Sequence, residues 1–204
     1  MRAVLLSARA RQGTEAVLDR VRATVARHAT IAGEFDVNDE LPATLDADRA
    51  VVVGGDGAIM AALRQCVGRT IPVVGVNIGR LGFLAEFDAD EFDRHAAEVL
   101  GGDPVVRQRM VLSVLVRDGD GRVRYEGLAI NDAVVTAGPP FRMIELALML
   151  DGEHGPEFQG DGIIVATPVG STAYNASAGG PIVHPDVEAI VVTPSAANSL
   201  AFRP

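Results

Sequence analysis

A single carboxylate lies between glycines at the end of an apolar run, in the stretch VVVGGDG at 51–57. A carboxylate within hydrogen-bond reach of a hydroxyl group can orient it and accept its proton, and Asp56 is placed for that chemistry. Gly55 and Gly57 would let a ligand approach the backbone closely. The open alternative is a tight strand-to-helix turn in which Asp56 only caps the helix.

The stretch matches neither common nucleotide-binding fingerprint. A GxGxxG pattern would need glycine at Met60, and a P-loop would need a Gly-Lys pair. All 18 basic residues are arginine, which excludes the P-loop lysine, the protein-kinase lysine and Schiff-base chemistry. Phosphate chemistry here must therefore use backbone amides, arginine or a metal ion. The histidines are scattered without the spacing of a zinc site.

Composition limits the partners of the chain. Its formal net charge is −9, and clustered cations are absent, so we expect it to bind neither nucleic acid nor membrane. Cys66 is the one cysteine and cannot form an internal disulfide. The N-terminal apolar run is too short for a signal peptide. We therefore expect a cytoplasmic protein.

The first hundred residues alternate between strand-like and helix-like segments. Continuous apolar runs predict strands at 2–6, near Phe35 and Val37, at 48–53 and at 72–76. Leu18, Val21 and Val25 recur at helical spacing and predict a helix after the first strand. Two more helices are predicted at 58–66 and 90–100. This alternation is typical of a parallel sheet covered on both faces, and GGDG follows one of its strands, where ligands bind. We predict a Rossmann-like α/β domain over 1–101, ending at a glycine pair.

The second half has a different pattern. The segments 105–118, 122–137 and 142–152 alternate polar and apolar residues and are separated by DGDG and GPP turns. These features predict antiparallel strands, and so a β-rich domain over 102–204. Only 171–180 has helical character, with Ser171 as the predicted N-cap and a glycine pair as the stop.

Four blocks resemble the NAD kinase family in order and spacing. They are VVVGGDG (51–57), PVVGVNIGRLGFLAEF (72–87), AINDAVV (129–135) and GDGIIVATPVGSTAYNASAGGPIVHP (160–185). The resemblance covers residues from about 50 to 204, and the last block is the most specific. It implies a Rossmann-like domain followed by an antiparallel β-rich domain, with NAD held between them. The implied reaction phosphorylates the 2′-hydroxyl of the adenosine ribose of NAD to give NADP.

The resemblance also implies the reactants. It implies ATP or polyphosphate as the phosphoryl donor and Mg²⁺ as the divalent ion, with no metal site formed by side chains alone. The partners are then the small molecules NAD and ATP. We also expect a homo-oligomer.

The resemblance assigns roles to particular residues. Asp56 is implied as the proton acceptor, and Gly55 and Gly57 as close contacts of the nucleotide phosphates. Asn131 and Asp132 match the Asn-Glu pair that reads the ribose and adenine. Asp161 resembles the carboxylate that holds the nicotinamide end. The remaining implied NAD-binding residues are Phe83, Thr172, Ala173, Tyr174, Asn175, Ala176, Ser177 and Ala196.

Three features depart from the family pattern. Ala58 replaces the threonine usual after GGDG, and Asn198 stands where histidine is common. The chain also stops at AFRP, where the family continues, so we expect it to lack the C-terminal end of the family and to be either a fragment or a shortened enzyme. Two other functions stay open: a diacylglycerol-type lipid kinase, which shares GGDG, and a non-catalytic dinucleotide-binding protein.

Overall fold

Two compact units, Met1–Arg107 and Gln108–Pro204, make up the chain in the computed structural model. The structure describes residues 1–79 and 84–198. Within these residues, no helix is both long and apolar enough to cross a membrane.

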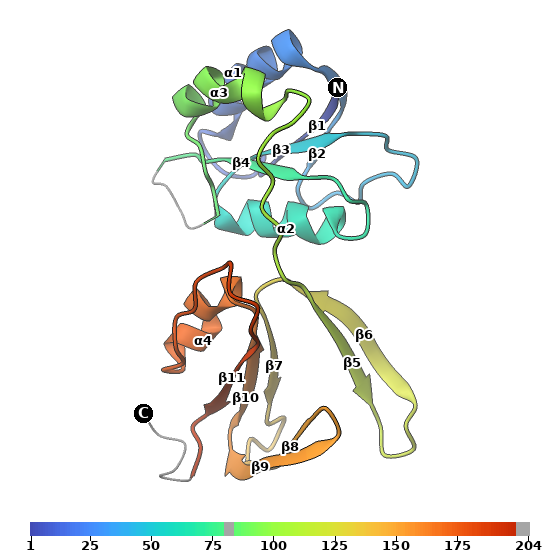
Figure 1. The fold of residues 1–204 in the computed structure, drawn as a ribbon, viewed down its shortest axis with the longest axis vertical. Coiled ribbons are helices and arrows are strands. Elements are labelled where there is room, and N and C mark those ends of the chain that lie inside the picture. The colour runs from blue at the N-terminus through green and yellow to red at the C-terminus, as the bar shows by residue number, and fades with distance from the viewer. Residues whose placement is uncertain (80–83, 199–204) are drawn as a thin grey trace. The chain divides into compact units, whose positions relative to one another are not determined.

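The first unit is a parallel sheet with helices on both faces (Figure 1). Its four strands pair in the order β2-β1-β3-β4, all in parallel. The strands are β1 Arg2–Ser7, β2 Thr30–Asp36, β3 Arg49–Val53 and β4 Val73–Val76. The helices are α1 Thr14–His28, α2 Asp56–Cys66 and α3 Ala89–Val99. The predicted Rossmann-like α/β fold is confirmed.

Alternate side chains of the central strands enter two separate cores. Leu5 and Val51 pack with α1 and α3 on one face of the sheet. Leu6 and Val52 pack with α2 on the other face. Since both faces are buried, the strands read in sequence as unbroken apolar runs, which is why the sequence predicted them.

The strand order places a switch point at the centre of this sheet. From β1 the chain crosses to β2 on one side, and from β3 it crosses to β4 on the other side. The loops that leave β1 (8–13) and β3 (54–55) therefore diverge from neighbouring strands. In open α/β sheets this divergence forms the crevice in which ligands bind.

The second unit is antiparallel, as predicted. Three strands form one sheet in the order β11-β10-β7, and two hairpins pair β5 with β6 and β8 with β9. The strands are β5 Leu112–Arg117, β6 Val123–Ala129, β7 Asp132–Thr136, β8 Ile144–Leu150, β9 Glu153–Gly160, β10 Gly162–Ala166 and β11 Val191–Ser195. A 3-10 turn, η1 Val169–Thr172, and a short helix, α4 Tyr174–Ser177, follow β10.

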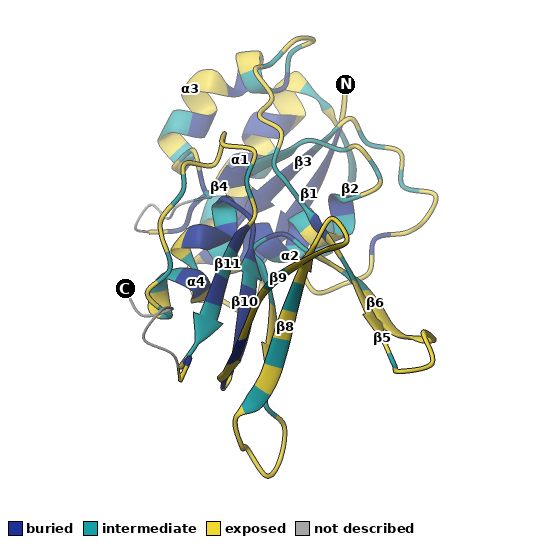
Figure 2. Cartoon of the chain, turned by 60° about the horizontal axis from the view of Figure 1, so that its bottom comes forward, coloured by how far each residue is buried: buried dark blue, intermediate teal, exposed yellow. Residues whose placement is uncertain are grey.

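Burial in the strands of this unit is greatest in β10 and β11. Figure 2 shows β10 largely buried and the β5–β6 hairpin largely exposed. Ile164 and Ala166 of β10 pack with Val191, and Ile163 of the same strand packs with Phe158. The buried central strand β10 therefore holds the candidate residues near its two ends in place.

Three local predictions were wrong. Residues 105–111 form no strand, and the segment 122–137 divides into β6 and β7 around Ile130 and Asn131. Ser171 is not an N-cap: it lies inside η1, and its hydroxyl donates to the carbonyls of Pro168 and Val183. Ala173 occupies the N-cap position of α4, where no side chain makes a capping bond.

Candidate active site

Asp56 is the first residue of α2, directly beyond the carboxyl end of β3. Its Oδ1 accepts a hydrogen bond of 3.1 Å from the Leu84 backbone amide. The tight strand-to-helix turn is present, but Gly55 occupies its N-cap position, so the predicted capping role of Asp56 is wrong. The half-buried carboxylate is therefore held at the end of a central strand, where a general base could meet a substrate.

Gly54 and Gly57 contribute to this turn in different ways. A Cβ on Gly54 would lie 2.4 Å from the Cβ of Ala58, so only glycine lets α2 start this close to β3. Among the residues that the structure describes, a Cβ on Gly57 would meet nothing within 4 Å, and Gly57 is exposed. The first turn of α2 is thus open beside Asp56, with backbone amides of a kind that bind phosphate.

In the second unit, a hydrogen-bonded turn fixes Asn131 at the start of β7. The Thr167 hydroxyl donates to the Ile130 carbonyl at 2.7 Å, and the Thr167 amide donates to the Asn131 carbonyl at 2.8 Å. Gly170 follows so closely that a Cβ there would lie 1.9 Å from the Asn131 carbonyl oxygen. We did not predict this role of Thr167 from the sequence. The feature that could have indicated it is a threonine placed directly after an apolar strand.

Asn131 and Asp132 each keep an acceptor without a partner. Asn131 Oδ1 and Asp132 Oδ2 are buried, and neither has a hydrogen-bond partner among the described residues. Burial raises the pKa of the Asp132 carboxyl, and a hydrogen bond from the Tyr174 backbone amide opposes that rise. Buried acceptors normally have partners, so this pair can receive hydroxyl or amino groups of a ligand.

The segment 172–177 lies against this pair through its Tyr174 amide. The Tyr174 side chain is 58% exposed, which leaves its ring face accessible to a base. Thr172 and Ser177 are exposed, and Ala173 and Ala176 are half-buried. Asn175 differs from its neighbours because it is fully buried and forms hydrogen bonds within the unit.

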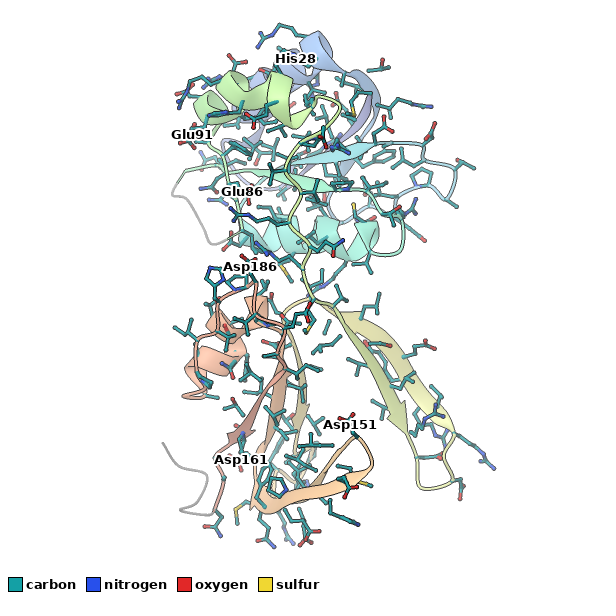
Figure 3. All side chains as sticks on the ribbon, in the orientation of Figure 1. His28, Glu86, Glu91, Asp151, Asp161 and Asp186 are labelled. Atoms are coloured by element: carbon teal, nitrogen blue, oxygen red, sulfur yellow. The ribbon has the colours of Figure 1, made fainter. Side chains whose placement is uncertain are left out.

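Asp161 and Ala196 lie at the other end of the same sheet. Strand register pairs Ala166 with Asp132 but Gly162 with Thr136, so Asp161 is separated from Asp132 by the length of β10. That length is on the order of 15 Å. Figure 3 shows Asp161 at the end of the sheet away from α4, and Ala196 directly follows β11, whose last residue pairs with Gly162. The structure therefore forms two groups of candidate NAD-binding residues rather than one.

Phe83 lies outside the described residues. For a metal ion, no group of three or more His, Cys, Asp or Glu side chains is suitably placed in the described part of the chain.

Comparison with known proteins decides the family. Residues 9–104 match the model of the ATP-NAD kinase N-terminal domain, and residues 130–204 match that of the ATP-NAD kinase C-terminal domain. An NAD kinase of Pseudomonas paraeruginosa is 40% identical over 209 residues, which cover 95% of this chain and 70% of that protein. The chain belongs to the NAD kinase family.

Two further relatives align with the whole length of this chain. The NAD kinase of Rhodopirellula baltica is 38% identical over 205 residues, which cover 100% of this chain and 65% of that protein. The crystal structure of yeast NADH kinase complexed with NADH is similar with a TM-score of 0.82 and 26% identity, over 100% of this chain and 65% of that one. The chain thus spans about two thirds of the length of these relatives.

Membership in the NAD kinase family bears on the alternatives from the sequence. The matched models and relatives are NAD kinases and an NADH kinase, and they give no support to a lipid kinase or to a non-catalytic binding protein. The block at 160–185 and the pair Asn131 and Asp132 fall within the C-terminal domain model. GGDG falls within the N-terminal domain model.

Proposed function

We propose that the protein transfers a phosphoryl group from ATP to the 2′-hydroxyl of the adenosine ribose of NAD, giving NADP and ADP. A bond forms between the 2′-oxygen and the terminal phosphorus of the donor. The bond from that phosphorus to its bridging oxygen breaks, and the hydroxyl proton passes to the carboxylate of Asp56. Inorganic polyphosphate is the other donor with the same terminal chemistry.

One observation carries the proposal. In a segment matched by the C-terminal domain model of ATP-NAD kinases, Asn131 Oδ1 and Asp132 Oδ2 are buried acceptors to which no described residue donates. Leaving such groups unpaired costs about 1–3 kcal/mol each, so a ligand with donors at these points would gain their hydrogen bonds. The ribose hydroxyls and the adenine amino group are donors of this kind.

Asp56 is the proposed proton acceptor because of its position and its support. A secondary hydroxyl is a weak nucleophile, and a positioned carboxylate assists its attack. The bond from the Leu84 amide holds one oxygen of Asp56, so the carboxylate keeps its orientation. Phosphoryl transfer otherwise depends mainly on positioning and on compensation of negative charge.

Mg²⁺ fits this scheme as a part of the donor. The described residues offer no metal-binding cluster, and Mg²⁺ commonly binds through substrate phosphates while keeping water ligands. Bound there, it neutralises charge on the transferred group. The carboxylates of the protein then remain available for orientation and proton transfer.

The remaining site residues are part of the same proposal. Gly57 gives the donor phosphates access to the first turn of α2, and Tyr174 stacks on a base, with exposed hydroxyls at Thr172 and Ser177 beside it. Asp161 contacts the nicotinamide end, Ala196 supplies a backbone contact to the dinucleotide, and the protein is a homo-oligomer. We propose that Phe83 packs against the adenine of NAD. We also propose that the protein is located in the cytoplasm.

The proposal predicts that the purified protein converts NAD to NADP in the presence of ATP and Mg²⁺. Product is measured by coupling to an NADP-specific dehydrogenase and by the mass added by one phosphoryl group. An NAD analogue with a 2′-deoxy adenosine ribose is the matched control, because it lacks only the attacked hydroxyl, and it should give no product.

Three results would contradict the proposal. Phosphatidate formed from diacylglycerol would indicate a lipid kinase, and NAD binding without turnover would indicate a non-catalytic protein. Undiminished turnover in excess EDTA would contradict the role given to Mg²⁺.

A further inference from the structure

Arg11 lies in the loop that leaves β1, on the same side of the sheet as GGDG. A Cβ on Gly55 would lie 2.8 Å from Arg11 Nη1, so this guanidinium occupies the space where any other residue at position 55 would place its side chain. Arg11 Nη2 also donates to the Ile78 carbonyl at 3.1 Å. The guanidinium therefore spans the carboxyl ends of β3 and β4 within the first unit.

Arg11 forms no ion pair with a carboxylate of the described residues. The Ile78 carbonyl is the one hydrogen-bond acceptor that they offer its side chain. An arginine has five N–H donors in a planar fork, so most of them stay available. Arg11 is exposed, and a ligand can reach it from solvent.

Two other arginines of the first unit are placed differently from Arg11. Arg22 pairs with Glu34 and Asp19, and Arg27 pairs with Asp93. These arginines are used in ion pairs on the surface of the first unit. Arg11 instead is anchored by a neutral carbonyl at the sheet's switch point, where ligands of this fold bind.

We propose that Arg11 binds the phosphates of the phosphoryl donor. The inference rests on the proposed function, because it takes Asp56 as the group that receives the proton of the attacking hydroxyl. The donor phosphorus must come within about 3–3.5 Å of that hydroxyl oxygen, so the donor phosphates lie near Asp56. The Arg11 guanidinium lies against Gly55, the residue directly before Asp56. The planar guanidinium fork of arginine matches the geometry of phosphate oxygens.

The choice of the donor over the diphosphate of NAD follows from the same positions. The candidate acceptors for the dinucleotide, Asn131 and Asp132, belong to the second unit, whereas Arg11 belongs to the first and lies beside the turn of α2 proposed for the donor phosphates. A triphosphate also carries more negative charge than the diphosphate of a dinucleotide. In a chain without lysine, an arginine that forms no ion pair with the described residues is a suitable side-chain cation for that charge.

Arg9 is a matched control in the same loop. Its backbone amide donates to Asp36 Oδ2 at 2.9 Å, and its charge acts on Glu34 and Asp36 of β2. It thus faces the opposite side of β1 from Gly55. Arg9→Gln removes the same charge as Arg11→Gln without touching GGDG.

The test measures dissociation constants by titration calorimetry for ATP, for inorganic tripolyphosphate and for NAD, each with Mg²⁺. For Arg11→Gln we expect binding of ATP and of tripolyphosphate to weaken about 10- to 100-fold. NAD binding should change less than about threefold, and Arg9→Gln should leave all three constants within that range. Arg11→Lys keeps the charge but not the fork, so its effect on the donors should be intermediate.

The outcomes separate this inference from the proposed function. Equal weakening by Arg11→Gln and Arg9→Gln, weakening of NAD rather than the donors, or no donor binding by the wild type would each overturn the role of Arg11. Normal, Arg11-dependent donor binding without any NADP formation would overturn the proposed function and leave the role of Arg11 in place. Matching circular-dichroism melting curves will show that both variants are folded.

Discussion

At the scale of single residues, Asp132 is subject to two opposed effects. Burial of its carboxyl raises the pKa, and the hydrogen bond from the Tyr174 amide lowers it by a smaller amount. Its second oxygen is buried and has no hydrogen-bond partner in the described part of the chain. In the absence of ligand, the charged form is therefore less favourable in the folded protein than in the unfolded chain.

This imbalance predicts how Asp132→Asn changes stability with pH. Because the folded pKa is raised, the folded state binds more protons than the unfolded chain in the pH range above 3.8, and wild-type stability falls as pH rises through the folded pKa. Asparagine carries no charge, so the variant should have the higher urea midpoint at pH 7. The two midpoints should converge as pH falls towards 3.8.

Asp151→Asn is the control for this prediction. Asp151 is an exposed residue of the same unit, at the β8–β9 turn, and its substitution removes the same charge (Figure 3). Its midpoint should follow the wild type across this pH range. A variant Asp132→Asn that is less stable than wild type at pH 7 would contradict the account of the buried carboxylate.

At the scale of elements, the segment after β10 depends on one buried side chain. Asn175 Nδ2 donates to the carbonyls of Ser171 and Pro181 at 3.0 and 2.9 Å, and its Oδ1 accepts from the Thr193 hydroxyl at 2.6 Å. These bonds fasten η1 and α4 to β11. The position of the Tyr174 amide against Asp132 follows from this attachment.

We predict that Asn175→Ala lowers the free energy of unfolding by at least about 2 kcal/mol. The substitution leaves buried donors and acceptors without partners, and each costs about 1–3 kcal/mol. Urea unfolding of the variant beside Ser177→Ala measures the effect. Ser177 is exposed in the same helix, so its change should stay within about 0.5 kcal/mol. Equal losses in the two variants would contradict the structural role of Asn175.

The elements also show how far the sequence could predict this protein. The parallel unit was predictable because strands buried on both faces, such as β1 and β3, are continuously apolar. The role of Asn175 was not, because its partners Pro181 and Thr193 are defined only by the folded turn. Arg11 was missed for a related reason: only the strand order brings its loop beside Gly55.

At the scale of the whole molecule, the proposed chemistry is divided between the two units. The first unit contains Asp56 and Arg11, and the second contains the acceptors of Asn131 and Asp132 that the described residues leave without a donor. The net charge of −9 opposes the approach of anionic reactants. The attraction for the anionic reactants must therefore come from local cations, from backbone amides and from Mg²⁺ bound to the donor.

The central claim is that Asp56 takes the proton of the attacking hydroxyl, and Asp56→Asn tests it most directly. Asparagine keeps the size and an acceptor oxygen for the Leu84 amide but cannot accept the proton. The kcat for NADP formation should fall about 10²- to 10⁴-fold. The dissociation constant for NAD, measured by titration calorimetry, should stay within about threefold of the wild type.

Asp103→Asn, which removes an exposed carboxylate from the same unit, should keep the wild-type kcat and so control for the loss of charge. The decisive measurement is the kcat of Asp56→Asn with NAD saturating. The account predicts its collapse with NAD binding preserved. A kcat near that of the wild type, with or without loss of NAD affinity, would contradict it and place the base elsewhere.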